Sequence, residues 1–289
     1  MRLLILGAGY SGKEIAKACR PLFADILGTT RSEAKFPSLS AAGIRPFLHD
    51  GETFGEALSA ELADVTHLIQ SIAPGQGGDR LVADAGSLKS LMPRLVWAGY
   101  LSTVGVYGDH DGAWVDEDSP LRPVSARSVE RVEAERRWQA AAGTAGVTLA
   151  ILRLSGIYGP GRNTFVNLAN GTARRLIKKD QVFNRIRVED IGRAAAFLIG
   201  RSLGGIQNVT DDEPSPPQDV VAEAARIMGV AVPPDQDFET AELSPMARSF
   251  YGENKRVSNA RICKLGFEFL YPDYRQSLQQ LWESGAWRG

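Results

Sequence analysis

Arg2-Leu3-Leu4-Ile5-Leu6 is a short apolar run that leads directly into Gly7-Ala8-Gly9-Tyr10-Ser11-Gly12, and residues 13–18 then read as the start of a helix. A strand, a Gly-x-Gly-x-x-Gly turn and a helix form the context in which this motif binds the pyrophosphate of a dinucleotide. Gly7 makes the tight turn, Gly9 lets the pyrophosphate approach the backbone, and Gly12 lets helix and strand pack closely. The phosphates then face the start of the helix, where Tyr10 and Ser11 lie.

Two other interpretations of this loop compete. The first is a glycine-rich turn without a ligand, which the strand–turn–helix context disfavours. The second is a phosphate loop of nucleotide triphosphatases, because Gly7 to Lys13 also matches G-x-x-x-x-G-K. That motif needs Ser or Thr at the next position to hold magnesium. Position 14 is Glu, so the sequence favours dinucleotide binding.

Short apolar runs alternate with longer amphipathic stretches through the first two-thirds of the chain. The pattern predicts strands at 2–6, 24–28, 45–48, 65–72, 95–101, 148–154 and 206–209, and helices at 12–20, 31–42, 53–60, 78–92, 126–143 and 190–201. Strands separated by helices imply right-handed crossovers and a parallel sheet covered on both faces. The fold class is therefore α/β, a Rossmann-type doubly wound parallel sheet, whose ligands bind beyond the carboxyl ends of the strands.

The pattern changes after about residue 210. Residues 211–217 are acidic and proline-rich, and apolar positions at helical spacing follow over 218–229. We predict a dinucleotide-binding domain at 1–210, with part of 160–185 contributing to the substrate lobe, and a small α-rich C-terminal lobe at 211–289.

Composition excludes several classes of protein. The 289 residues carry 33 Lys and Arg against 34 Asp and Glu, a net charge of −1. This balance argues against binding to nucleic acid or an anionic membrane. Two distant cysteines, Cys19 and Cys263, and three scattered histidines predict neither a disulfide framework nor a metal site. No run approaches the ~18 apolar residues of a membrane span, so we expect a cytoplasmic protein.

The end of the second predicted strand bears on the choice of cofactor. A carboxylate there binds the ribose 2′-hydroxyl of NAD, but the chain reads Thr29-Thr30-Arg31-Ser32. Thr30 and Arg31 would instead bind a 2′-phosphate, which favours NADP over NAD, unless Arg31 is only a solvated residue at a helix start. Asp50 follows the third strand, where it would meet the adenine amino group or cap the next helix.

Three further stretches follow in order: Ser102-Thr103-Val104-Gly105-Val106-Tyr107-Gly108, residues 152–162 around Gly156-Ile157-Tyr158-Gly159-Pro160, and Arg187-Val188-Glu189-Asp190-Ile191. With the glycine loop, they make residues 1–210 resemble an extended short-chain dehydrogenase/reductase of the NAD-dependent epimerase/dehydratase group. The resemblance implies a Rossmann fold, a nicotinamide cofactor and a Ser/Thr–Tyr–Lys catalytic set. Thr103, beside Ser102, matches the hydroxyl residue that binds the substrate's oxygen.

The chain departs from the family at the Tyr-x-x-x-Lys pair. The matching positions are Ser125 and Val129, and no tyrosine lies between 108 and 157. We interpret Ser125 as a helix cap. The usual proton donor is missing, which points to an atypical subgroup of the family.

Other tyrosines are candidates for its place. Tyr251 and Lys255 have the right spacing but lie in the predicted C-terminal lobe, in what reads as a turn. Tyr107 belongs to a Val-Tyr-Gly signature that core packing explains better. Tyr158, in a Gly-Pro-Gly loop, is a candidate wall of the substrate pocket or an acid–base group.

Four charged residues near these motifs have alternative roles. Arg153 and Arg162 flank the loop around Tyr158, where each would bind an anionic substrate or form a salt bridge. Arg187 and Asp190 match a family motif with a structural role.

Two hypotheses of different classes follow. The first is an NAD(P)-binding oxidoreductase or epimerase/dehydratase-like enzyme that acts on a small polar substrate held by Thr103. The second is a non-catalytic NADP-binding redox sensor that reports to a partner. The missing Tyr–Lys pair favours the sensor, whereas the retained Ser102-Thr103 favours catalysis. The resemblance also implies a homodimer through the helices at 78–92 and 126–143, where alanines 134, 140, 141 and 142 would permit close packing.

Overall fold

A seven-stranded sheet forms the centre of the computed structural model, which describes residues 1–75, 78–83 and 86–289. Its strands are β1 (Arg2–Leu6), β2 (Asp25–Thr30), β3 (Arg45–Leu48), β4 (His67–Gln70), β5 (Trp97–Thr103), β7 (Thr148–Leu154) and β11 (Gly205–Val209). The pairs from β5 through β4, β1 and β2 to β3 are parallel. The predicted Rossmann-type sheet is confirmed, since each strand end lies within two residues of its predicted position.

The order of the strands creates the place where a ligand would bind. They lie in the order β11-β7-β5-β4-β1-β2-β3, so the chain winds outward from β1 in one direction and later from β4 in the other. The direction reverses between β1 and β4. In doubly wound sheets, ligands bind at such a switch point, beyond the carboxyl ends of the strands. The glycine loop follows β1 and therefore lies there.

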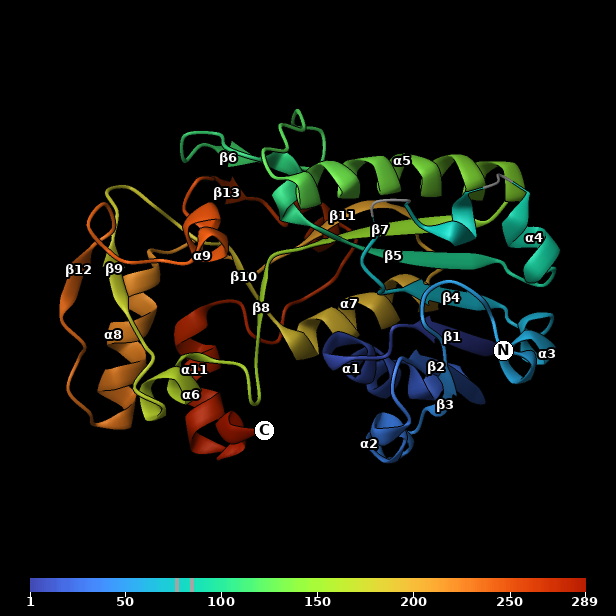
Figure 1. Cartoon of the computed structure of the whole chain (residues 1–289), viewed down its shortest axis with the longest axis horizontal. Coiled ribbons are helices and arrows are strands. Elements are labelled where there is room, and N and C mark those ends of the chain that lie inside the picture. Colours follow the sequence, from blue (N-terminus) through green and yellow to red (C-terminus); the bar gives the residue numbers. More distant parts are fainter. Residues whose placement is uncertain (76–77, 84–85) are drawn as a thin grey trace. The chain divides into compact units, whose positions relative to one another are not determined.

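Helices cover the sheet on its two faces (Figure 1). They are α1 (Tyr10–Cys19), α2 (Phe36–Ala41), α3 (Glu56–Leu62), α4 (Ser87–Leu91), α5 (Ala126–Ala145) and α7 (Val188–Gly200). The predicted helix at 78–92 is wrong in extent: a 3-10 turn at Arg80–Val82 and the short α4 take its place, and residues 84–85 lie outside the described residues.

The core on the α5 face explains why these segments form. Leu4, Leu6 and Leu68 from the strands pack with Trp138 and other buried residues of α5. Three of the four alanines that suggested a dimer face, at 134, 141 and 142, are buried in this core. Because these alanines pack against the sheet of their own chain, they do not support a dimer interface. The homodimer stays a prediction.

The described chain divides into two compact units. Unit 1 comprises 1–106, 126–153 and 191–207, and unit 2 comprises 107–125, 154–190 and 208–289. The helices of unit 2 are α6 (Thr164–Ala169), α8 (Pro217–Met228), α9 (Pro245–Phe250), α10 (Ala260–Lys264) and α11 (Tyr274–Glu283). Its short strands are β6 (Trp114–Val115), β8 (Gly156–Tyr158), β9 (Arg175–Ile177), β10 (Arg185–Arg187), β12 (Asp235–Asp237) and β13 (Arg256–Val257). No helix among the described residues is long and apolar enough to cross a membrane.

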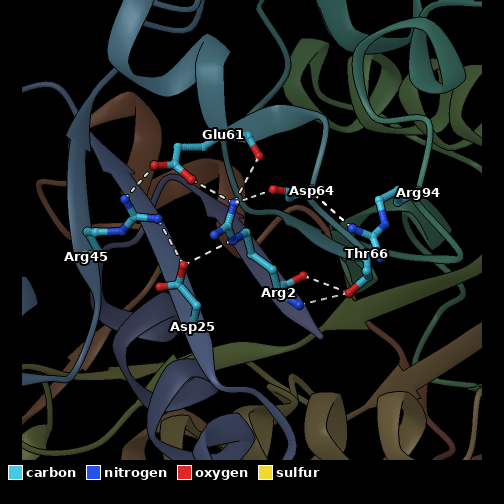
Figure 2. A network of polar contacts seen from close by, with 7 residues as sticks. All are labelled: Arg2, Asp25, Arg45, Glu61, Asp64, Thr66 and Arg94. Carbon is cyan, nitrogen blue, oxygen red and sulfur yellow. Dashed lines mark hydrogen bonds and ion pairs between the residues drawn. The ribbon is translucent and has the colours of Figure 1, made fainter.

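An ion-pair network joins the amino-terminal ends of the strands of unit 1 (Figure 2). Asp25 of β2 lies 3.0 Å from Arg2 of β1 and 2.9 Å from Arg45 of β3. Glu61 of α3 bridges the same two arginines, at 2.7 and 2.6 Å. These groups lie at the edge opposite the glycine loop, so the network holds the strands together without approaching the candidate site.

Candidate functional site

The glycine loop has the tight geometry that the motif predicts. Gly7 has φ +78°, and a Cβ there would lie 2.9 Å from Ile72 Cγ1 and 3.2 Å from the Ile72 backbone nitrogen. A Cβ on Gly12 would lie 3.2 Å from Ile5 Cγ2. Gly7 is thus required by both its backbone conformation and its neighbour, and Gly12 lets α1 approach β1.

Gly9 differs from these two glycines because its missing side chain faces open space. A Cβ there would meet nothing closer than the Gly7 carbonyl oxygen at 3.9 Å. Gly9 is also the N-cap of α1, which carries no side-chain cap. Tyr10 and Ser11 form the first turn of this helix. The loop therefore leaves room at the helix start for a pyrophosphate, as the motif requires.

A cavity of about 730 Å³ lies in unit 1 beside this loop. Leu6, which precedes Gly7, and Ile72, which packs against Gly7, line it. Arg31 after β2, Asp50 after β3 and Gln70 at the end of β4 also line it. The cavity therefore lies at the switch point of the sheet, and its volume suits a cofactor-sized ligand.

Thr30 and Arg31, which are expected to bind a 2′-phosphate, lie at the end of β2. The Thr30 hydroxyl accepts a hydrogen bond from the Ser32 amide at 3.3 Å, and the exposed Arg31 lines the cavity. The carboxylate of β2, Asp25, lies at the opposite end of the strand. No acidic side chain therefore ends β2.

Asp50 also lines the cavity but is engaged by its own loop. Its Oδ1 accepts hydrogen bonds from the amides of Glu52 at 2.8 Å and Thr53 at 3.3 Å. These amide donors hold the pKa of Asp50 below its usual range. Asp50 thus caps a turn before α3 and also lines the cavity.

Several cavity residues were not identified from the sequence. The rings of His49 and Phe54 stack with centroids 4.8 Å apart and line the cavity. Gln70 Nε2 donates to Asp79 at 2.6 Å, and Asp79 also accepts from Trp138 Nε1 at 3.0 Å. Gln70 is a polar residue near the end of the predicted strand at 65–72, which was the signal available in the sequence. No such signal marks Asp79.

Ser102 and Thr103 adjoin each other at the carboxyl end of β5 but have different surroundings. Buried Ser102 donates its hydroxyl hydrogen to Glu135 of α5 at 2.5 Å, and Glu135 forms a 2.7 Å ion pair with buried Arg153. The Thr103 hydroxyl accepts from the Gly105 amide at 3.1 Å, at the last position of the strand. Ser102 and Arg153 therefore belong to a buried polar cluster, and Thr103 is the less buried hydroxyl of the pair.

The two positions predicted to match the Tyr–Lys pair lie at the start of α5. Ser125 immediately precedes the helix, and the side chain of Val129 is 51% exposed. Ser128 is the residue of this turn that faces the strand end, because a Cβ on Gly105 would lie 3.1 Å from its Oγ.

Tyr158 belongs to unit 2, whereas Ser102 and Thr103 belong to unit 1. It is the last residue of β8, and its buried hydroxyl has no hydrogen-bond partner among the described residues. Burial raises the pKa of Tyr158, and the nearby Asp211 carboxylate adds to this effect. The phenol therefore keeps its proton at neutral pH.

The other candidates have structural contacts within their units. Tyr251 stacks on Phe238 with centroids 4.8 Å apart, and Lys255 donates to the Gly108 carbonyl oxygen at 2.7 Å. These two residues do not share a helix. Tyr107 donates to Asn208 at 2.7 Å in the core. Buried Asp190 accepts from two backbone amides at 2.9 Å each.

Comparison with known proteins gives consistent matches. The model of the NAD dependent epimerase/dehydratase family matches residues 90–192. A structure of a functionally unknown protein from Silicibacter pomeroyi DSS is 46% identical, with a TM-score of 0.89 over 99% of each chain. A Methylobacillus flagellatus protein, solved as a candidate NAD-dependent epimerase/dehydratase, is 26% identical with a TM-score of 0.73 over 98% of each chain. Protein YeeZ of Escherichia coli K12 is 27% identical over 94% of this chain and 97% of its own.

Proposed function

The chain belongs to the NAD-dependent epimerase/dehydratase family, and from that premise we propose that it is an NADP-binding oxidoreductase or epimerase/dehydratase-like enzyme that acts on a small polar substrate. The observation that carries the proposal is the cavity of about 730 Å³ that is lined by Leu6, which precedes the glycine loop, and by Arg31. When bound, the nicotinamide supplies hydride transfer. The protein supplies binding, orientation and hydrogen bonding around it.

The cofactor would extend from the glycine loop into the cavity. Gly7, Gly9 and Gly12 shape the loop, and the start of α1 at Tyr10 and Ser11 would face the pyrophosphate. The adenine would lie near Asp50. The open space at Gly9 and the uncapped helix start support this arrangement.

NADP is the proposed form of the cofactor, although the family binds both forms. Thr30 and Arg31 offer a hydroxyl and a guanidinium, which suit a 2′-phosphate. The carboxylate that would favour the 2′-hydroxyl of NAD is absent from the end of β2. Arg31 lies at the cavity wall, which supports the same choice.

Thr103 would bind the reacting oxygen of the substrate. Ser102 is engaged with Glu135, so its role would be to fix the strand end that carries Thr103. The Tyr158 phenol of unit 2 keeps its proton because burial raises its pKa, so its proposed role in proton transfer is that of a donor. A phenol of this kind is a poor general base at neutral pH.

A turnover assay tests the enzymatic part of the proposal. The full chain is incubated with NADPH and a panel of small aldehydes, ketones and hydroxy acids, and absorbance of NADPH is followed. We expect consumption with at least one substrate, and a loss of about 100-fold or more in kcat for Thr103→Ala. Thr103→Ser is the matched control, which keeps the hydroxyl. NADPH affinity should stay within about twofold in both variants.

A redox sensor is the second candidate, and one observation favours it. The predicted positions of the family's acid–base pair fall on Ser125 and on Val129, which is exposed at the start of α5. A sensor would bind NADPH in the same cavity without consuming it. Tight binding, with no turnover on any member of the panel, would favour this candidate over the enzyme.

A further inference from the structure

His49 lines the cavity of unit 1 beside the two residues that are proposed to bind a 2′-phosphate. It directly follows β3, and its backbone amide donates a hydrogen bond to the Thr30 carbonyl oxygen at 3.0 Å. Thr30 ends β2, and Arg31 comes next in the chain. His49 is therefore a neighbour of Thr30 across the strand ends, and it shares the cavity wall with Arg31.

The imidazole of His49 is held in one orientation by its own loop. Its Nδ1 lies 3.0 Å from the Thr53 carbonyl oxygen, and its ring stacks on Phe54 with an interplanar angle of 14°. Because a carbonyl oxygen can only accept, Nδ1 carries the hydrogen of the neutral ring and Nε2 has none. Within the described part of the chain, no hydrogen bond occupies Nε2. This nitrogen is left for a group that enters the cavity.

The charges of the cavity wall favour a protonated imidazole once a phosphate has entered. Among the described residues that line the cavity, Arg31 carries a guanidinium, whereas Asp50, Glu52 and Asp79 carry carboxylates. A phosphate monoester adds a charge of about −1.5 to −2 at pH 7. Arg31 alone does not balance these negative charges, and an imidazole is the side chain that takes up a proton near neutral pH. Phosphate binding therefore favours proton uptake by His49.

Building on the proposed binding of NADP, we infer that His49 is a third residue of the 2′-phosphate subsite, beside Thr30 and Arg31. The ring takes up a proton from solvent at Nε2 when the phosphate binds, and donates it to a phosphate oxygen in a charge-assisted hydrogen bond. Arg31 supplies a charge that does not vary with pH, whereas His49 supplies one that does. The preference for NADP over NAD therefore rises as the pH falls from about 8.5 to about 6.5.

Isothermal titration of the full chain tests the inference with two probes. These are adenosine 2′,5′-bisphosphate and 5′-AMP, which lacks the 2′-phosphate. We expect the affinity for the bisphosphate to fall about fivefold between about pH 6.5 and about pH 8.5, because the imidazole is less readily protonated at the higher pH. The affinity for 5′-AMP should change by less than about twofold over the same range.

His49→Gln localises the effect, because glutamine retains a polar side chain but cannot become charged. This variant should bind the bisphosphate about fivefold more weakly than the wild type at about pH 6.5 and lose the pH dependence, while it binds 5′-AMP within about twofold of the wild type. His110→Gln is the matched control, since His110 belongs to unit 2 and does not line the cavity. It should bind both probes like the wild type.

Two results for His49→Gln contradict the inference. One is a bisphosphate affinity that still depends on pH as in the wild type. The other is an equal loss of affinity for both probes, which would assign His49 to the adenine or the 5′-phosphate. If His49→Gln does not fold, the pH profile of the wild type carries the test.

The wild-type titration also separates this inference from the proposed cofactor. A bisphosphate that binds more tightly than 5′-AMP, by a ratio that does not change with pH, retains NADP binding through Arg31 and overturns the role of His49. A bisphosphate that binds no more tightly than 5′-AMP at any pH contradicts the choice of NADP, and the role of His49 with it.

Discussion

Two glycines of the same loop, Gly7 and Gly9, should respond differently to the same substitution. In Gly7→Ala, the new Cβ meets the Ile72 backbone at φ +78°, so we expect a loss of about 1–3 kcal/mol in the free energy of unfolding. In Gly9→Ala, φ is −87° and the Cβ faces open space. This variant should unfold within about 0.5 kcal/mol of the wild type, yet bind NADPH about tenfold more weakly or worse, because the methyl group occupies the pyrophosphate's path.

Urea unfolding and fluorescence titration with NADPH measure the two effects separately. A Gly9→Ala variant with wild-type affinity for NADPH would show that the open space at this position is not used by the cofactor.

The contribution of Asp211 to the free energy of unfolding should depend on pH. Its folded-state pKa lies above the ordinary value of 3.8 because burial disfavours the charge. Its contribution to stability is therefore present below about pH 3.8 and is lost as the pH rises toward the folded-state pKa. Asp211→Asn cannot ionise, so it should gain stability relative to the wild type with rising pH, reaching about 1–3 kcal/mol at pH 7.

The comparison requires urea unfolding of the two proteins at several pH values between 4 and 7. A difference that does not change with pH, or one that favours the wild type at pH 7, would mean that Asp211 is ionised and well solvated or paired in the folded protein.

At the scale of elements, one buried ion pair ties α5 to the sheet. Glu135 of α5 contacts Ser102 of β5 and Arg153 of β7, and all three are buried. Glu135→Leu removes the carboxylate that pairs with the buried Arg153 charge, so we expect a loss of about 3–5 kcal/mol in the free energy of unfolding. Ser102→Ala removes only one hydrogen bond and should cost about 1 kcal/mol.

The double variant Glu135→Leu/Arg153→Met is the informative control, since it removes both charges and should recover much of the loss. If the double variant is as unstable as Glu135→Leu alone, packing and not the loss of the Glu135 charge explains the lower stability.

The elements themselves were largely predictable. Runs such as Leu3–Leu6 are buried throughout their length, and a strand covered on both faces reads as an unbroken apolar run. Helix α8 ends as predicted at Gly229, which takes the left-handed conformation with φ 69°. The segment at 78–92 was not predictable in the same way, because a 3-10 turn and a short helix replace the single helix that its length suggested.

At the scale of the whole molecule, the sequence indicated the fold and the glycine loop but not the composition of the cavity. Of the residues in the cavity wall, His49 follows β3 and Gln70 ends β4, and only the strand order brings them together. Unit 2 combines 107–125, 154–190 and 208–289, which no local pattern predicts.

Asp211 illustrates the same limit. It lies in an acidic, proline-rich stretch that reads as solvated, whereas pairing of its backbone with Arg185 buries it. Tertiary contacts decide whether such a residue is buried, so the composition of the stretch could not predict the burial of Asp211.

The central claim is that the cavity beside the glycine loop binds NADP through Arg31. The most direct measurement is a fluorescence titration of the wild type and Arg31→Ala with NADPH and with NADH. We predict that the wild type binds NADPH about tenfold or more tightly than NADH, and that Arg31→Ala loses this preference by weakening NADPH binding alone. Binding of neither nucleotide, or an equal preference in the two proteins, would contradict the claim.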